Sequence, residues 1–214
     1  MSTTTPLDPL DDMFPPEPFM SIIGHITHSL SHVADMLVYI DEYQQGPTTS
    51  LRNACMDSFL LHFRMLYNFL LGPRGGRHGI GGDAHSHDFL ETSTWPRPKT
   101  VATKRMKVLA DFMSKYRAHL SRGRFVPIYQ SLEDILGVRR LTAEFLARTL
   151  LDYLDVLDDF IGHLPDTRES GKRAWQGAAY SARYKTEVRL GIRPSDFPDN
   201  DSLRPFKNLG PATP

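Results

Sequence analysis

The chain lacks several features that mark whole classes of protein. Cysteine occurs once in 214 residues, at Cys55, so an intrachain disulfide and the disulfide-rich secreted scaffolds are excluded. Cys55 lies in the most apolar stretch of the chain, where a thiol is expected to be buried and inert rather than nucleophilic. The N-terminus lacks the basic and apolar regions of a secretory signal, and no apolar run approaches the roughly 20 residues that span a bilayer. We therefore expect a cytoplasmic protein without a membrane segment.

The chain also lacks net charge, because 25 Lys and Arg residues balance 25 Asp and Glu residues. A balanced molecule has no overall field that attracts nucleic acid or a membrane surface. The composition instead changes along the chain. Residues 1–18 hold five prolines and four acidic residues and are expected to be a disordered tail. Residues 19–165 are expected to form the helical domain, and residues 166–214 to hold a basic, aromatic helix and a proline-rich tail that is also disordered.

Apolar residues recur at three- and four-residue steps through most of the helical domain. This spacing places them on one side of successive helices. Helices are expected over residues 19–43, 48–72 and 100–122, and a further long helix ends near residue 164. The sequence therefore predicts an all-α fold, an up-and-down bundle of about four main helices. Residues 172–189 are expected to form the basic helix, which either contacts RNA or docks on the bundle.

One helix, over residues 48–72, is apolar nearly all round and yet carries a stripe of polar side chains. Asp57, Arg64 and Asn68 fall within about 40° of one another at 100° per residue. A helix that is apolar on nearly every side is packed on most of them. Arg64 is therefore expected to be partly buried and to need a carboxylate or several acceptors. His119 projects from the apolar face of the next helix, so we interpret Arg64, Asn68, Asp57 and His119 as one polar site.

The strongest local charge lies in residues 97–124, which hold nine basic side chains and one acidic side chain. Such a run is a candidate surface for a phosphate backbone. The residues that we expect to contact nucleic acid are Lys104, Arg105, Lys107, Lys115, Arg122 and Arg124. The alternative is a solvated face that pairs with acidic residues of the last long helix, within the chain or across a homodimer. Those acidic residues are Asp152, Asp155 and Asp159.

The glycine-rich connection of residues 72–98 holds the densest group of metal-type ligands in the sequence. Loops of this length inside a compact domain are usually functional or disordered. The candidate metal ligands in this loop are His78, His85, His87 and Asp88. The alternative is a flexible loop that becomes ordered only where Phe89 and Leu90 dock on the helices.

Three further histidines, His25, His28 and His32, lie at three- and four-residue steps and share one face of the first helix. Three imidazoles on one face are able to bind a metal ion. Residues 25–32 hold no acidic residue or cysteine that would act as a further ligand. The expected role of the three histidines is therefore a solvated polar edge of the helix. The sequence predicts no cofactor.

Residues 53–71 contain the segment SFLLHFRMLYNFLL, and an Asp-Phe pair at residues 88–89 and a His-Leu-Ser element at residues 119–121 follow it. This order of motifs resembles a group of uncharacterised bacterial helical proteins over about residues 50–125. It also resembles, more distantly, the HEPN superfamily of four-helix domains. Many members of that superfamily are RNA-cutting toxins or phage-defence effectors, and others are binding modules without catalysis.

The resemblance implies a helical module that binds RNA or a partner protein in bacterial stress or phage defence. In HEPN nucleases an arginine is followed four to six residues later by a histidine, whereas here Met65 follows Arg64 and residues 68–70 are Asn-Phe-Leu. His119 would then supply the histidine as general acid or base, with Arg64 stabilising the charged phosphorane and Asp57 orienting one of them. Two alternatives stay open. One is a dimerising structural protein with a buried Arg64–His119 network, and the other is a metal-dependent enzyme that uses the loop.

Overall fold

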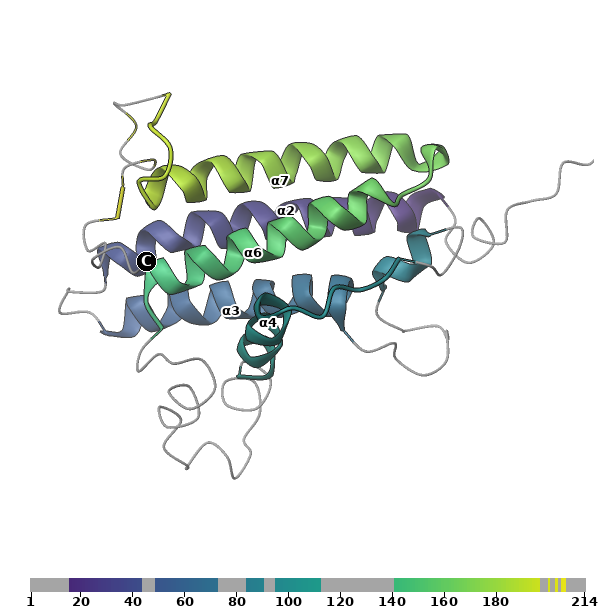
Figure 1. Cartoon of the computed structure of the whole chain (residues 1–214). Helices are drawn as coiled ribbons and strands as arrows, with labels where there is room; N and C mark the ends of the chain where they lie inside the picture. The colour runs from purple at the N-terminus through teal and green to yellow at the C-terminus, as the bar shows by residue number, and fades with distance from the viewer. Residues whose placement is uncertain are drawn as a thin grey trace, which may run out of the picture.

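The computed structural model describes residues 16–43, 49–72, 84–90, 95–112 and 141–196, together with residues 200, 203, 205 and 206. The α-helices of these parts are α2 (Pro16–Glu42), α3 (Thr49–Leu71), α4 (Val101–Phe112), α6 (Ala143–Gly162) and α7 (Glu169–Arg189). Two short 3-10 helices, η1 (Ser86–Phe89) and η4 (Asp166–Arg168), complete the regular structure that is described. The prediction of an all-α helical bundle is confirmed (Figure 1). None of the helices in the described ranges is both long and apolar enough to cross a membrane.

The four long helices form two antiparallel pairs, α2 with α3 and α6 with α7 (Figure 1). The up-and-down order therefore holds within each pair. The alternation of helix directions breaks between the two pairs. α6 begins at the end of the bundle where α3 also begins, so α3 and α6 run parallel. The long connection through α4 carries the chain back to that end. α4 itself lies against α3 and α6, outside the four long helices.

The helix boundaries lie close to the predicted ones, with a correction at the N-terminal tail. α2 begins at Pro16, so the predicted disordered tail of residues 1–18 overlaps the first turn of the helix. Proline is tolerated there because the amide groups of a first turn have no partner within the helix. The remainder of that tail lies outside the described residues. The same holds for residues 113–140, which include the end of the predicted third helix.

The core lies where α2, α3 and α6 meet. Leu30 and Leu37 of α2 and Phe63 of α3 are fully buried. Tyr153 of α6 is fully buried as well; its ring centroid lies 5.9 Å from that of Phe63, and its hydroxyl donates to the backbone oxygen of Leu66 at 3.1 Å. Burial raises the pKa of Tyr153 far above its ordinary value. The hydroxyl therefore stays protonated and links α6 to α3.

Tyr153→Phe is expected to lower the free energy of unfolding by about 0.5–1.5 kcal/mol, the usual net contribution of one hydrogen bond. The loss stays in this range because the Leu66 carbonyl keeps its partner within the helix. Urea unfolding followed by circular dichroism measures the change. Tyr39→Phe, at an exposed tyrosine of α2, is the matched control and should leave stability unchanged. Equal losses in the two variants would contradict the assigned hydrogen bond.

α7 packs on the bundle. Trp175 is 1% exposed. Its ring centroid lies 5.3 to 6.0 Å from those of three phenylalanines, Phe69, Phe89 and Phe160. Of the two roles that the sequence leaves open for residues 172–189, docking on the core is the one observed. The buried Trp175 ring is not available to stack on a nucleobase.

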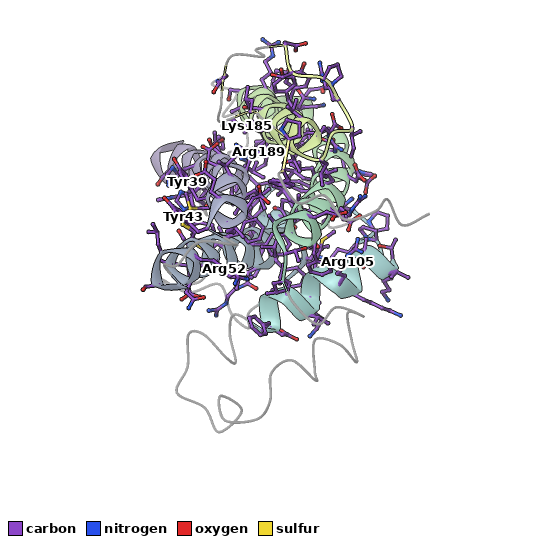
Figure 2. All side chains as sticks on the ribbon, turned by 90° about the vertical axis from the view of Figure 1, so that its left-hand side faces the viewer. Tyr39, Tyr43, Arg52, Arg105, Lys185 and Arg189 are labelled. Carbon is purple, nitrogen blue, oxygen red and sulfur yellow. The ribbon has the colours of Figure 1, made fainter. Side chains whose placement is uncertain are left out.

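The C-terminal half of α7 is fixed to α2 by charged side chains (Figure 2). Arg189 is almost fully buried and donates to the backbone oxygen of Ala34, while Lys185 Nζ lies 2.8 Å from Asp35 Oδ1. Burial lowers the pKa of Arg189 to about 10, so the guanidinium stays charged at neutral pH. Part of the C-terminal tail, which was predicted to be disordered, packs here as well. The amide of the buried Phe206 donates to the Arg189 backbone oxygen at 2.8 Å.

Candidate metal centre

Three histidines from two neighbouring helices converge where α2 meets α3. His28 and His32 are four residues apart on α2, which places them on one face, and His62 meets them from α3. Their ring centroids lie 5.8 Å apart for His28 and His32, 5.7 Å for His28 and His62, and 4.2 Å for His32 and His62. Each ring offers one nitrogen, and these nitrogens all lie within 4.8 Å of one another. We name His28, His32 and His62 the histidine site.

The antiparallel packing of α2 and α3 brings the histidine site together, and two serines orient it. His32 Nε2 lies 2.7 Å from Ser58 Oγ on α3, and His62 Nδ1 lies 3.1 Å from Ser29 Oγ on α2. When each of these ring nitrogens donates to its serine, the lone pair is on Nδ1 of His32 and on Nε2 of His62. A hydrogen-bond partner on one ring nitrogen fixes the orientation of an imidazole and leaves the other nitrogen for a metal ion. Each helix therefore orients a ligand of the other.

Burial and the neighbouring rings favour the neutral form of two of the three imidazoles. His32 and His62 are half-buried, whereas His28 is exposed. Burial is the largest cause that lowers the pKa of His32 and of His62, and the neighbouring histidines lower both further. Asp35 opposes the shift at His32. A neutral imidazole is the form that binds a metal ion, so protons compete weakly for the histidine site near neutral pH.

The donor atoms determine which ions the histidine site can hold. Imidazole suits zinc, copper, nickel and iron. Zinc–nitrogen bonds of about 2.0–2.1 Å place the nitrogens of a tetrahedral site about 3.4 Å apart. A bound ion would therefore require the donor nitrogens, which lie up to 4.8 Å apart, to move closer together. Three imidazoles fill three tetrahedral positions and leave one for water or another ligand.

The metal-free protein is expected to lose stability as the pH falls below about 6.5, the pKa of histidine in the unfolded chain. The folded-state pKa values of His32 and His62 lie below the unfolded value of 6.5, so between these values the unfolded chain binds more protons. Their contribution to stability is complete above the unfolded pKa and is lost as the pH decreases through that window. Urea unfolding at a series of pH values measures it.

The matched controls for this pH dependence are histidine variants on the same two helices. The double variant His32→Gln/His62→Gln should flatten the dependence, because neither replacement titrates in this range. His25→Gln, at an exposed histidine of α2, should keep it. An unchanged slope in the double variant would contradict the assignment to His32 and His62.

Three of the loop residues that were predicted as metal ligands, His85, His87 and Asp88, are described, and His85 contacts the C-terminal end of α3. His85 Nδ1 lies 3.2 Å from the backbone oxygen of Asn68, and the amide of His85 donates to Asp88 Oδ2 at 2.7 Å. Arg97 donates to backbone oxygens at the end of α3 and to His87 Nδ1 at 2.8 Å. A helix end leaves carbonyl groups without partners in the helix, and these contacts satisfy some of them. His85 contacts the end of α3, and His87 and Asp88 have partners within this connection, so metal binding by these three residues stays a prediction.

Docking of the loop on the helices is confirmed. Phe89 and Leu90 are buried, and the Phe89 ring centroid lies 5.6 Å from that of Phe69. Within the part of the chain that the structure describes, the metal-type ligands that converge belong to the histidine site and not to this loop. His78 lies outside the described residues, so its role in metal binding stays a prediction.

The structure places the predicted Arg64 site only in part. Asp57, Arg64 and Asn68 all lie on α3 and are half-buried, which agrees with the partial burial expected for Arg64. His119 lies outside the described residues. The joint site of Arg64 and His119, and the catalytic roles assigned to it, stay predictions.

Two residues of the predicted nucleic-acid surface are engaged with carboxylates. Arg105 of α4 forms an ion pair with Asp152 of α6 (Figure 2), and Lys107 pairs with Asp111 of its own helix at 2.5 Å. Lys104 is exposed. The Arg105–Asp152 pair is the pairing of basic and acidic helices within the chain that the sequence offers as an alternative. The other residues that were predicted to contact nucleic acid lie outside the described residues. They are Lys115, Arg122 and Arg124.

Cys55 has no reactive setting. It is half-buried on α3, and burial raises the pKa of its thiol. A raised pKa keeps the thiol protonated at neutral pH, which agrees with the inert role that the sequence predicts.

The sequence prediction missed His62 and placed His28 and His32 in a group with His25. His25 is exposed and does not belong to the converging group, and His32 is half-buried instead of lying on a solvated edge. A signal was present, because His28 and His32 on one helix and Ser58 and His62 on the next have the same four-residue spacing. Two antiparallel helices can place such pairs opposite each other. The spacing alone does not say which faces meet.

No protein-family model matches the chain, and no curated protein or solved structure matches it either. The resemblance to HEPN domains and to the bacterial helical proteins stays a prediction. The geometry of the histidine site carries the functional conclusion.

Proposed function

We propose that this chain is a metal-binding helical bundle that holds one divalent transition-metal ion at the histidine site. The observation that supports the proposal is the convergence of three ring nitrogens from two helices, all within 4.8 Å of one another. Serine partners orient His32 and His62, and the lowered pKa values keep both rings neutral. Convergent donors, fixed orientation and the neutral form are what an imidazole site needs.

Three protein ligands favour a reactive centre over a purely structural one. Structural zinc sites are closed by four protein ligands, whereas catalytic sites keep one position for water or substrate. The exposed His28 places the histidine site at the protein surface, where small molecules have access. A divalent ion bound by three imidazoles lowers the pKa of a bound water towards neutrality. Metal-dependent hydrolysis or hydration is therefore the reaction class that this centre supports best.

Metal analysis tests the proposal. Protein purified without a polyhistidine tag is incubated with zinc and separated from free metal by gel filtration. One zinc ion per chain is expected to stay bound, and the melting temperature is expected to rise. At a free zinc concentration one hundred times the dissociation constant, the added stability is about 2.7 kcal/mol. Zinc far below one equivalent, together with an unchanged melting temperature, would overturn the proposal.

Ser58→Ala is expected to weaken zinc binding about 10- to 100-fold, the usual cost of removing a partner behind a ligating imidazole. The variant keeps all three histidines but lacks the hydroxyl that lies 2.7 Å from His32 Nε2. Competition with a chromophoric chelator measures the dissociation constant. Ser50→Ala, at an exposed serine of the same helix, is the matched control and should bind zinc as the wild type does. Equal affinities in the two variants would show that Ser58 does not orient His32.

RNA or partner-protein binding in bacterial stress or phage defence is the second candidate function. It is supported by the basic character of residues 97–124 and by the exposed Lys104 of α4. RNA integrity after induced expression tests whether this second candidate includes RNA cleavage. RNA degradation by the wild type that a folded Arg64→Ala variant lacks, and that His62→Gln retains, would favour a nuclease that uses Arg64. Intact RNA with the wild type and with both variants would contradict the hypothesis of a nuclease.

A further inference from the structure

The ligands of the histidine site leave the charge of a bound ion uncompensated. Three neutral imidazoles contribute no negative charge, so a divalent ion keeps its full charge there. Asp35, three residues after His32, is the acidic group that acts on the charge of His32. Its Oδ1 accepts a hydrogen bond from Lys185 Nζ at 2.8 Å and lies 3.9 Å from Arg189 Nη2. Side chains of α7 therefore already neutralise this carboxylate.

The histidine site is open to solvent at His28. Ser29, the partner of His62, is 2% exposed, and Ser58, the partner of His32, is half-buried. These two histidines are therefore held at the interface of α2 and α3. His28 is exposed, so a small molecule reaches the site from solvent at this residue.

We propose that the fourth coordination position takes an anionic oxygen of a small molecule, such as a carboxylate or phosphate group. This inference rests on the proposed metal-binding function and adds the class of small ligand that competes with water for the open position. An anionic oxygen neutralises charge that the three imidazoles leave on the ion, whereas a neutral amide or ester oxygen does not. Zinc accepts carboxylate oxygens at about 2.0–2.2 Å. The ligands selected by this centre are therefore small carboxylates or phosphates rather than neutral molecules of the same shape.

Cobalt(II) in place of zinc makes the fourth ligand visible, because the absorption of cobalt depends on its coordination. Untagged protein is loaded with one equivalent of cobalt(II) and titrated separately with acetate, inorganic phosphate and acetamide. Acetate and acetamide have nearly the same size and shape but differ in charge. We expect acetate and phosphate to change the spectrum at concentrations at least about tenfold lower than acetamide, a difference of about 1.4 kcal/mol in binding free energy.

The outcomes distinguish failure of this inference from failure of the metal site. Absence of a protein-bound cobalt spectrum would overturn both. A bound cobalt ion whose spectrum does not respond to acetate or phosphate would overturn the anion-binding inference and leave the metal site intact. The same holds for a spectrum that responds to acetamide as readily as to acetate.

Asp35→Asn provides a second test. The substitution removes one negative charge near His32 and leaves Lys185 without its carboxylate, so the site becomes more positive. Acetate is then expected to bind the cobalt-loaded variant several-fold more tightly, and acetamide binding should not change. His25→Gln, at an exposed histidine one turn before His28, is the matched control and should leave both affinities unchanged. Equal changes for acetate and acetamide in Asp35→Asn would overturn the inference.

Discussion

Trp175→Ala is expected to lower the free energy of unfolding by about 3–5 kcal/mol, the usual loss for a buried aromatic side chain. Trp175 is 1% exposed, and its ring lies within 6.0 Å of rings from three other elements. These rings are Phe69 of α3, Phe89 of η1 and Phe160 of α6. The alanine variant has a cavity where all four elements meet. Because a domain is stable by only about 5–15 kcal/mol, this loss is a large part of the total.

Urea unfolding followed by circular dichroism measures the effect of Trp175→Ala. Trp175→Phe keeps an aromatic ring in the cluster and should lose clearly less, so it gives a measurable value even where the alanine variant does not fold. Tyr180→Ala removes an exposed aromatic side chain from the same helix and is the matched control. Equal losses for Trp175→Ala and Tyr180→Ala would contradict the docking of α7 through Trp175.

His62→Gln is expected to weaken zinc binding by more than about a hundredfold. The substitution removes one of three ligands, whereas loss of a partner behind a ligand already costs about 10- to 100-fold. It also removes the only ligand that α3 contributes among the described residues, so His28 and His32 are left to bind the ion from α2 alone. Isothermal titration calorimetry measures the affinity. The rise in melting temperature on zinc addition should disappear together with it.

His25→Gln is the matched control for His62→Gln. His25 is exposed on α2 and is not a member of the histidine site, so zinc affinity should be that of the wild type. The opposite pattern, with tight binding by His62→Gln and weak binding by His25→Gln, would contradict the proposed site. In that case the ion would be bound by His25, His28 and His32, the group that the sequence suggested.

The end of α3 shows why ligand-type residues in a loop are weak evidence for a metal site. His85 contacts a backbone oxygen of α3, and Arg97 donates to others and to His87. The last carbonyl groups of a helix need partners, and imidazole and guanidinium groups serve as well as any donor. Composition therefore points to the loop, although His85 contacts a helix end and His87 contacts Arg97.

Local patterns in the sequence were enough to predict the all-α class and the approximate bounds of the long helices. They were enough because apolar spacing and helix-ending residues are local signals that need no knowledge of the fold. The same local information predicted that Phe89 and Leu90 dock, and that Arg64 is partly buried. It also predicted a start for α2 that is too late, because Pro18 was taken as the end of the tail, although a first turn tolerates proline and α2 begins at Pro16.

The tertiary structure alone decided which side chains meet. His62 joins His28 and His32 only because one particular face of α3 packs against α2, and no spacing along the chain specifies that face. The docking of Trp175 was likewise open, since a basic helix with aromatic residues fits both a surface and a core. Contacts between residues that are distant in sequence depend on helix directions and register. Those are set by the packing of the whole bundle and not by any one segment.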